Sequence, residues 1–155
     1  GILGANFDCA QISYSSYLGC RESFEAHGLS LDESWTEACR YSMAEGYAAA
    51  GRILDRTKGL TALFALSDVM AIGAIRCLRD RGLRGPEDIS VVGFDGVALG
   101  EYCVPRLTTV RQDTRSMVHR AAEILLSRLT EELPPVHETV PFTLIPGESA
   151  GPSPI

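Results

Sequence analysis

The stretch Leu60-Thr-Ala-Leu-Phe-Ala-Leu66 is a continuous apolar run, and Ser67-Asp68 follows it directly. A run of this length without alternation is typical of a strand that is covered on both faces, as in a parallel sheet. Residues 68–81 have a helical composition, and Gly82 provides a natural end for that helix. We expect Ser67 to cap its N-terminus. A buried strand followed at once by a helix predicts an α/β fold.

Strand and helix patterns alternate along the rest of the chain. We expect strands at Gly1–Gly4 (the end of one), 35–41, 89–94 and 107–110. Residues 136–145, which Pro141 interrupts, predict a strand or a pair of strands at a sheet edge. We expect helices at 13–27, 46–54 (with Ser42 and Glu45 as a capping box) and from Asp113 or Thr114 to about Leu129. The short connections favour an open parallel sheet flanked by helices, with right-handed crossovers.

Length and composition indicate one globular domain. The chain has 155 residues, of which 45% are hydrophobic and 22% charged. We expect a domain over residues 1–150 and a disordered tail at 151–155, and the abrupt beginning suggests a fragment of a longer protein. The net charge of −6 argues against direct binding of nucleic acid by this segment. Neither a signal peptide nor an apolar run long enough for a membrane helix is visible.

The reactive residues form no recognisable catalytic or metal-binding motif. None of the five cysteines stands in a C-x-x-C pair, which leaves a zinc site without support and indicates reduced thiols in a cytoplasmic protein: Cys9, Cys20, Cys39, Cys77 and Cys103. The sequence has no glycine-rich phosphate loop and no G-x-S-x-G motif. His27, His119 and His137 are scattered, and we expect them at the surface. We therefore predict no enzyme activity, no metal and no cofactor.

Polar residues directly follow three of the predicted strands. These groups are Ser67-Asp68, Asp95-Gly96 and Arg111-Gln112-Asp113. In open α/β sheets, ligands bind at the carboxyl ends of the strands, so these residues are candidates for a binding site. A carboxylate at Asp95 can accept two hydrogen bonds from a ligand, although an aspartate here can equally cap its own turn. For Asp68, a first-turn carboxylate stabilised by the helix dipole is the favoured role.

The expected helix 68–81 is apolar nearly all round. One face can cover the sheet, and the other must contact something else. Either the helix is sandwiched within the fold, or it forms a contact between subunits. Local sequence does not separate these alternatives.

Three segments, in this order, resemble the LacI/GalR family of bacterial regulators. Thr61-Ala-Leu-Phe-Ala-Leu-Ser67-Asp68-Val-Met-Ala-Ile-Gly73-Ala is similar to the family's T-A-x-x-x-x-N-D-x-M-A-x-G-A segment. Gly82-Leu-Arg-Gly-Pro86-Glu-Asp88-Ile-Ser-Val-Val-Gly93-Phe94-Asp95 resembles its G-x-x-x-P-x-D-I-S-V-V-G-[FY]-D signature. Pro105-Arg-Leu-Thr-Thr-Val-Arg-Gln112 resembles P-x-L-T-T-V-x-Q. The resemblance covers most of the chain from about Tyr41 onward, and residues 1–29 more weakly.

The resemblance implies a periplasmic-binding-protein-like fold of type I, with two linked subdomains and a ligand cleft between them. The chain would hold the C-terminal subdomain, with the helix at 113–130 belonging to the other subdomain. It would sense a small-molecule effector, a sugar or related metabolite, and control operator DNA through a helix-turn-helix headpiece that this chain lacks. A periplasmic sugar-binding protein of a transporter is the alternative, and an enzyme on a doubly wound sheet is a weaker one.

The resemblance also carries over particular positions. Asp95 matches an effector-binding aspartate, Tyr41 an aromatic ring that packs on the ligand, and Gln112 a glutamine of the cleft. Ser67 replaces the usual asparagine, and Ser16 stands where members commonly have a sugar-binding arginine, which argues against a typical sugar. We expect a homodimer formed by helix 68–81 and loop 100–105, with these interface residues: Ile72, Ile75, Arg76, Arg79, Tyr102 and Cys103.

Overall fold

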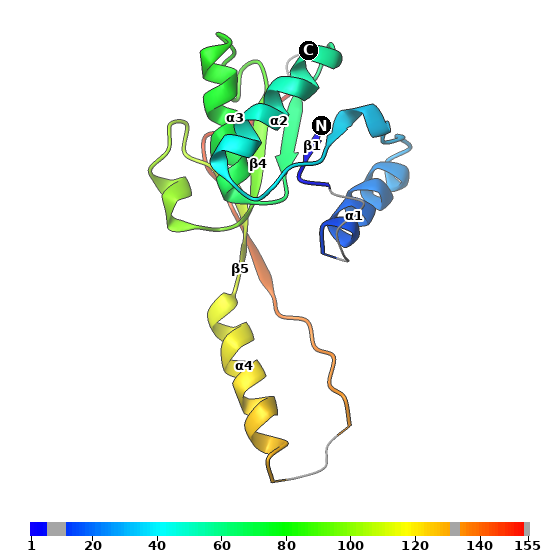
Figure 1. Cartoon of the computed structure of the whole chain (residues 1–155), viewed down its shortest axis with the longest axis vertical. Helices are drawn as coiled ribbons and strands as arrows, with labels where there is room; N and C mark the ends of the chain where they lie inside the picture. Colours follow the sequence, from blue (N-terminus) through cyan, green and yellow to red (C-terminus); the bar gives the residue numbers. More distant parts are fainter. Residues whose placement is uncertain (6–11, 131–133, 154–155) are drawn as a thin grey trace.

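The computed structural model describes residues 1–5, 12–130 and 134–153, and Figure 1 shows their arrangement. The strands are β1 (Ile2–Leu3), β2 (Thr36–Glu37), β3 (Ala62–Ala65), β4 (Ser90–Asp95), β5 (Thr108–Gln112) and β6 (Phe142–Ile145). The α-helices are α1 (Ile12–Ala26), α2 (Met43–Arg56), α3 (Asp68–Asp80) and α4 (Thr114–Ser127), and two short 3-10 helices are η1 (Glu33–Trp35) and η2 (Ala98–Glu101).

The six strands form one open sheet in the order β2-β1-β3-β4-β5-β6. The first five strands are mutually parallel, as predicted. The expectation of a wholly parallel sheet is wrong for β6, which pairs antiparallel to β5 with Gln112 opposite Phe142. The sheet is therefore mixed. The edge position predicted for this last segment is confirmed, but only its second half is a strand, because Pro141 cannot donate to a ladder.

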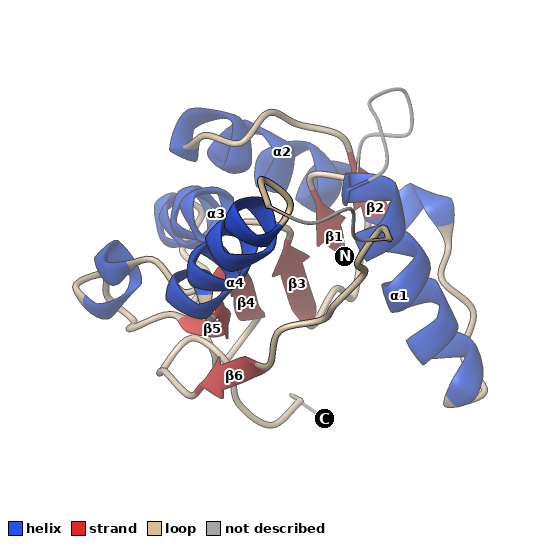
Figure 2. Cartoon of the chain, turned by 90° about the horizontal axis from the view of Figure 1, so that it is seen from below, coloured by secondary structure: helices blue, strands red, loops and turns tan. Residues whose placement is uncertain are grey.

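Helices cover the two faces of the sheet unequally. Figure 2 shows α2 and α3 together on one face and α1 on the other. The largest fully buried side chains lie mainly between the sheet and the pair α2–α3: Leu3, Ile53, Leu63, Met70, Leu78 and Val91. The two helices touch backbone to backbone, because a Cβ on Gly73 would lie 2.0 Å from the carbonyl oxygen of Met43. Helix α3 is thus sandwiched between the sheet and α2 over much of its circumference.

Helices α2 and α3 begin after the predicted N-cap residues, but the capping hydrogen bonds differ from those expected. The Ser42 hydroxyl accepts a hydrogen bond of 3.2 Å from the Glu45 N–H, which confirms Ser42 as the N-cap of α2. The Ser42 N–H donates to the Arg40 carbonyl, so the reciprocal half of a capping box is missing. Ser67 stands at the N-cap position of α3, but its side chain makes no capping hydrogen bond, and the expected cap is wrong in this respect.

The strand expected over residues 35–41 is much shorter than its sequence range. Only Thr36 and Glu37 pair with β1, and Trp35 belongs to η1. Glu37 is held by side chains of α2, since it accepts hydrogen bonds from Arg52 at 2.5 Å and from Arg56. These ion pairs fasten β2 to α2 at the edge of the sheet.

Helix α4 projects away from the sheet (Figure 1). The Asp113 carboxylate caps it by accepting a hydrogen bond of 3.0 Å from the Ser116 N–H. None of the residues of α4 is buried, and its exposed apolar side chains include Met117, Val118, Leu125 and Leu126. Arg120 pairs with Glu138 at 2.6 Å and so ties α4 to residues 134–141, which run back toward β6. We call α4 and residues 134–141 the arm.

The remaining expectations concern exposed and sulfur-containing residues. The three histidines are exposed, as predicted. Cys20, Cys39, Cys77 and Cys103 are free thiols, while Cys9 lies outside the described residues. The disordered tail at 151–155 stays a prediction; Gly151 exchanges hydrogen bonds with the Ser90 side chain, and residues 154 and 155 are not among those described. Among the helices that the structure describes, none has the length and apolarity needed to cross a membrane.

Candidate functional site

Asp95 and Gln112 meet at the carboxyl edge of the sheet, where β4 and β5 end. The two strands are parallel neighbours, and Asp95 stands opposite Arg111 in their register. The Gln112 amide donates a hydrogen bond of 3.0 Å from Nε2 to Oδ1 of Asp95. The structure thus brings together two of the four residues expected to bind an effector. The second carboxylate oxygen of Asp95 is the natural acceptor for a ligand hydroxyl or amine.

The backbone of Asp95 adopts a conformation that side-chain-bearing residues rarely take. Its φ is +114°, which is costly for any residue other than glycine. Gly96 continues the turn with φ +75°, and a Cβ there would lie 2.5 Å from the Cβ of Arg111. Local strain of this kind persists when the surrounding structure enforces it, and it is found preferentially at functional sites. The turn aims the Asp95 carboxylate at β5 and at Gln112.

Tyr41 lies in the segment that precedes α2 and interacts electrostatically with Asp95. Its side chain is half exposed, at 52%. Burial raises the pKa of its phenol, and the negative charge of Asp95 raises it further. The ring and the carboxylate are therefore close enough to interact electrostatically. A half-exposed aromatic ring beside a carboxylate suits a ligand with both an apolar face and polar substituents.

Ser67, the fourth expected residue, lies in the interior rather than on an open surface. It is only 4% exposed, and it directly precedes Asp68, which is completely buried. The proposed role of Ser67 as an effector contact stays a prediction.

Asp68 connects α3 to β5 and to the turn that follows β4. Its Oδ2 accepts a hydrogen bond of 2.7 Å from the Val97 N–H, and its Oδ1 accepts one of 2.5 Å from the Thr109 hydroxyl. Burial raises the pKa of this carboxyl, and the hydrogen bonds oppose the rise. Asp68 does stand in the first turn of α3, as expected, but its buried carboxylate also joins α3 to distant segments of the chain. A Cβ on Gly93 would lie 2.2 Å from this carboxylate, which explains the glycine there.

Two cavities meet at Phe94, the residue before Asp95. One, of about 430 Å³, lies between α1 and the sheet. The other, of about 510 Å³, lies beside the arm and is lined by Gln112, Asp113, Met117 and residues 138–142 as well as Phe94 and Val110. Phe94 contributes to the walls of both. The Asp95–Gln112 pair therefore stands next to mainly apolar space that Phe94 lines.

The residues expected at a dimer interface fall into two groups. Ile75 is 7% exposed and packs inside the protomer, because α2 and the sheet cover most of α3. The sandwiched alternative therefore describes most of α3, and the dimer interface stays a prediction. Ile72 is partly buried, whereas Arg76, Arg79 and Tyr102 are exposed and Cys103 is partly so. A groove of about 290 Å³ separates the C-terminal half of α3 from Val104 and Pro105.

Sequence reasoning missed Asp68 as a cross-link and Phe94 as a cavity wall. The Asp68–Thr109 hydrogen bond joins residues 41 positions apart, which no local pattern reveals. Phe94 reads only as one apolar residue of a strand. Within residues 1–5, 12–130 and 134–153, no group of three or more His, Cys, Asp or Glu side chains is arranged to hold a metal ion.

Comparison with known proteins places this geometry among bacterial regulators. The profile of the periplasmic-binding-protein-like domain matches residues 2–150. The HTH-type transcriptional repressor PurR of Haemophilus influenzae is 37% identical over 116 residues, which are 75% of this chain and 34% of that protein. The chain thus spans about a third of the length of the curated relatives that it matches.

Solved structures agree with the sequence comparison. A complex of the transcriptional regulator CelR with cellobiose superposes with a TM-score of 0.89 at 34% identity, over 97% of this chain and 46% of that one. A sugar-binding transcriptional regulator of the LacI family from Escherichia coli, complexed with phosphate, gives a TM-score of 0.86 at 30% identity, over 96% of this chain and 53% of that one.

Proposed function

Because the chain belongs to the periplasmic-binding-protein-like domain family, in the form found in LacI-type regulators, we propose that it is the effector-sensing and dimerising part of a transcriptional regulator. Its effector is a small metabolite, sugar-like in its hydroxyl-bearing part. The observation that carries this proposal is the hydrogen-bonded pair Asp95–Gln112 at the carboxyl edge of the sheet, with the Tyr41 ring beside it.

The proposed mechanism is allosteric. An effector held at Asp95 contacts a second subdomain on the far side of the cleft, and the arm is part of that second subdomain. The exposed apolar side chains of α4 support this assignment, since they need a partner. Closure of the cleft changes the arrangement of two protomers and so the fit of two DNA-binding headpieces to operator half-sites. The regulator works in the cytoplasm, where its DNA is, and performs no chemical reaction.

A transporter-associated sugar-binding protein is not favoured, since the matched relatives are transcriptional regulators. The complete gene separates the two functions directly. We expect the reading frame upstream of Gly1 to encode a helix-turn-helix domain. A secretion signal in its place would contradict the proposal.

The decisive experiment measures, by calorimetry, how tightly the complete polypeptide binds cellobiose and related sugars. We expect Asp95→Ala to weaken binding at least about ten-fold, because a charge-assisted hydrogen bond contributes roughly 1.5–3 kcal/mol. Asp55→Ala is the matched control, since this exposed carboxylate near the end of α2 pairs with Arg81, the residue that follows α3. Equal affinities of Asp95→Ala and the parent protein would refute Asp95 as an effector ligand.

A further inference from the structure

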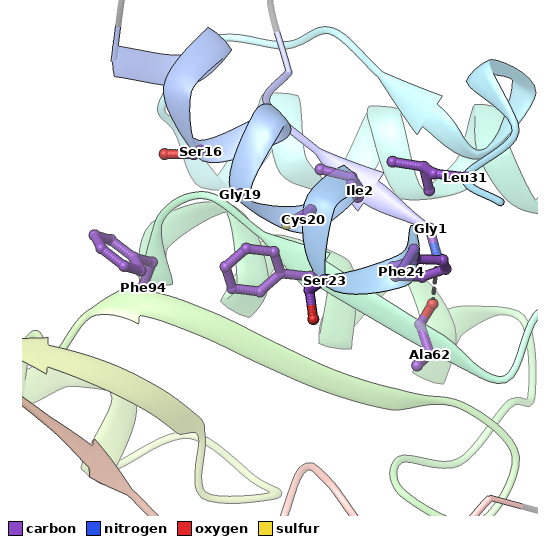
Figure 3. A pocket seen from close by; sticks show the side chains of 11 residues that line it. Gly1, Ile2, Ser16, Gly19, Cys20, Ser23, Phe24, Leu31, Ala62 and Phe94 are labelled. Carbon is purple, nitrogen blue, oxygen red and sulfur yellow. Dashed lines mark hydrogen bonds between the residues drawn. The ribbon is translucent and has the colours of Figure 1, made fainter. Parts of the chain in front are cut away.

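The cavity of about 430 Å³ between α1 and the sheet is large enough for a ligand group and almost entirely apolar. Figure 3 shows its lining, which includes the side chains of Ile2, Cys20, Phe24, Leu31 and Phe94 and the hydroxyls of Ser16 and Ser23. Phe64 lines it as well. Burial raises the pKa of the Cys20 thiol, as expected for a wall that water reaches poorly. All of these residues come from this chain.

Strand alternation explains why the floor of the cavity is apolar. Leu63, Ala65 and Val91 point toward α3 and are buried there. The alternate residues of the same strands therefore face α1, and they include Phe64 and Phe94. Helix α1 covers this second face only in part, and the space left over is the cavity.

The cavity adjoins the candidate effector site through Phe94. This ring precedes Asp95 in the chain, and it also lines the second cavity, which Gln112 shares. In Figure 3, Ser16 and Phe94 lie at one end of the cavity and Leu31 at the other. The residue that directly precedes Asp95 thus lines the end of an apolar cavity that extends along the sheet beneath α1.

We propose that this cavity is an apolar subsite that accepts an aromatic or branched aliphatic group of the effector, while Asp95 and Gln112 hold its hydroxyl-bearing part. The second half of this statement rests on the proposed function, whereas the cavity exists independently of it. Ser16 lines the end of the cavity beside Phe94 with a short side chain, and the rings of Phe24, Phe64 and Phe94 provide flat surfaces for stacking. The effector class is therefore a glycoside or polyol with an apolar substituent.

The test uses a variant that fills the cavity without disturbing the fold. Gly19 lines the cavity on α1, and a Cβ added there meets no atom within 4 Å. Gly19→Leu therefore occupies the mouth and also favours the helix, in which glycine is a poor residue. Ser15→Leu is the matched control, because Ser15 is exposed on the same helix and does not line the cavity.

Benzyl alcohol is the probe, and amide chemical shifts of the 155-residue chain are the readout. We expect saturable shifts at Cys20, Phe24, Phe64 and Phe94, at least ten-fold weaker binding in Gly19→Leu, and unchanged binding in Ser15→Leu. Absence of saturable shifts at these residues, or equal binding by Gly19→Leu and the parent, would overturn the subsite. Asp95→Ala should bind this probe normally, so that a failure of the proposed effector site is distinguishable from a failure of the cavity.

The complete polypeptide tests the effector class. Phenyl β-D-glucopyranoside should bind at least ten-fold more tightly than methyl β-D-glucopyranoside, and Gly19→Leu should abolish that difference. Equal affinities of the two glycosides in the parent protein would overturn the assignment of an apolar substituent.

Discussion

The hydroxyl of Thr109 donates a hydrogen bond of 2.5 Å to Oδ1 of Asp68, and both residues are buried. The same carboxylate accepts from the Val97 N–H at 2.7 Å. Asp68 is the first residue of α3, Thr109 lies on β5, and Val97 follows the strained turn at Asp95. One side chain thus connects the proposed dimer helix to the turn and to the strand that form the proposed effector site.

Removal of the Asp68 carboxylate should destabilise the fold. Asp68→Ala leaves the buried Thr109 hydroxyl and the part-buried Val97 N–H without their acceptor, and an unpaired buried donor costs about 1–3 kcal/mol. Urea denaturation should show a clear decrease in the free energy of unfolding. Asp80→Ala, which removes an exposed carboxylate paired with Arg76, should cost less than about 1 kcal/mol. An unchanged urea midpoint for Asp68→Ala would show that the cross-link contributes nothing.

Acid should weaken the attachment of β2 to α2 through Glu37. Burial acts to raise the pKa of Glu37, but the hydrogen bonds and charges of Arg52 and Arg56 outweigh it and hold the pKa below its usual range. A carboxyl with a lowered folded-state pKa stabilises the fold above its unfolded-state pKa, and this stabilisation is lost as the pH falls through the folded value. Glu37→Gln should therefore be less stable than the parent at pH 7, and the difference should shrink below about pH 4. A difference that is constant from pH 7 to about pH 3 would contradict this.

A charge on the remaining accessible face of α3 should break the proposed dimer. Ile72 is partly buried in the protomer and lies one turn before the exposed Arg76. Ile72→Glu should give a folded monomer by light scattering, since a buried unpaired charge is strongly unfavourable at an interface. Ala48→Glu, on an exposed position of α2, should leave the mass unchanged. If Ile72→Glu stays folded and dimeric, α3 is not the contact.

The 155-residue chain alone should not bind duplex DNA. Its net charge is −6, and phosphate binding depends on clustered positive charge. A gel shift at about 0.15 M salt should show free DNA at micromolar protein. A complex at submicromolar concentration would show that DNA binding does not need a separate headpiece.

Local sequence predicted the buried strands, because a strand covered on both faces is apolar throughout. The apolar run 60–66 predicts β3, and the strand that ends at Asp95 predicts a site at the carboxyl edge, where Gln112 indeed meets it. The antiparallel direction of β6 was not predictable from sequence. It depends on the path of the chain between β5 and β6, through α4 and residues 134–141. Nor was the covering of α3 by α2 predictable, since an apolar helix surface has the same composition whether a neighbouring helix or another subunit covers it.

The opposition of Gln112 and Phe142 across β5 and β6 has a topological consequence. The chain departs for the arm and returns from it at two hydrogen-bonded neighbours, so that the arm is an insertion at the tip of a β-hairpin. Its length is then independent of the rest of the sheet: residues can be added or removed beyond that pair without a shift in the register behind it. Conversely, a rotation of the arm relative to the sheet acts on both strands of the hairpin at once. Gln112 is the last residue of β5 before the arm, and its side chain is hydrogen-bonded to Asp95.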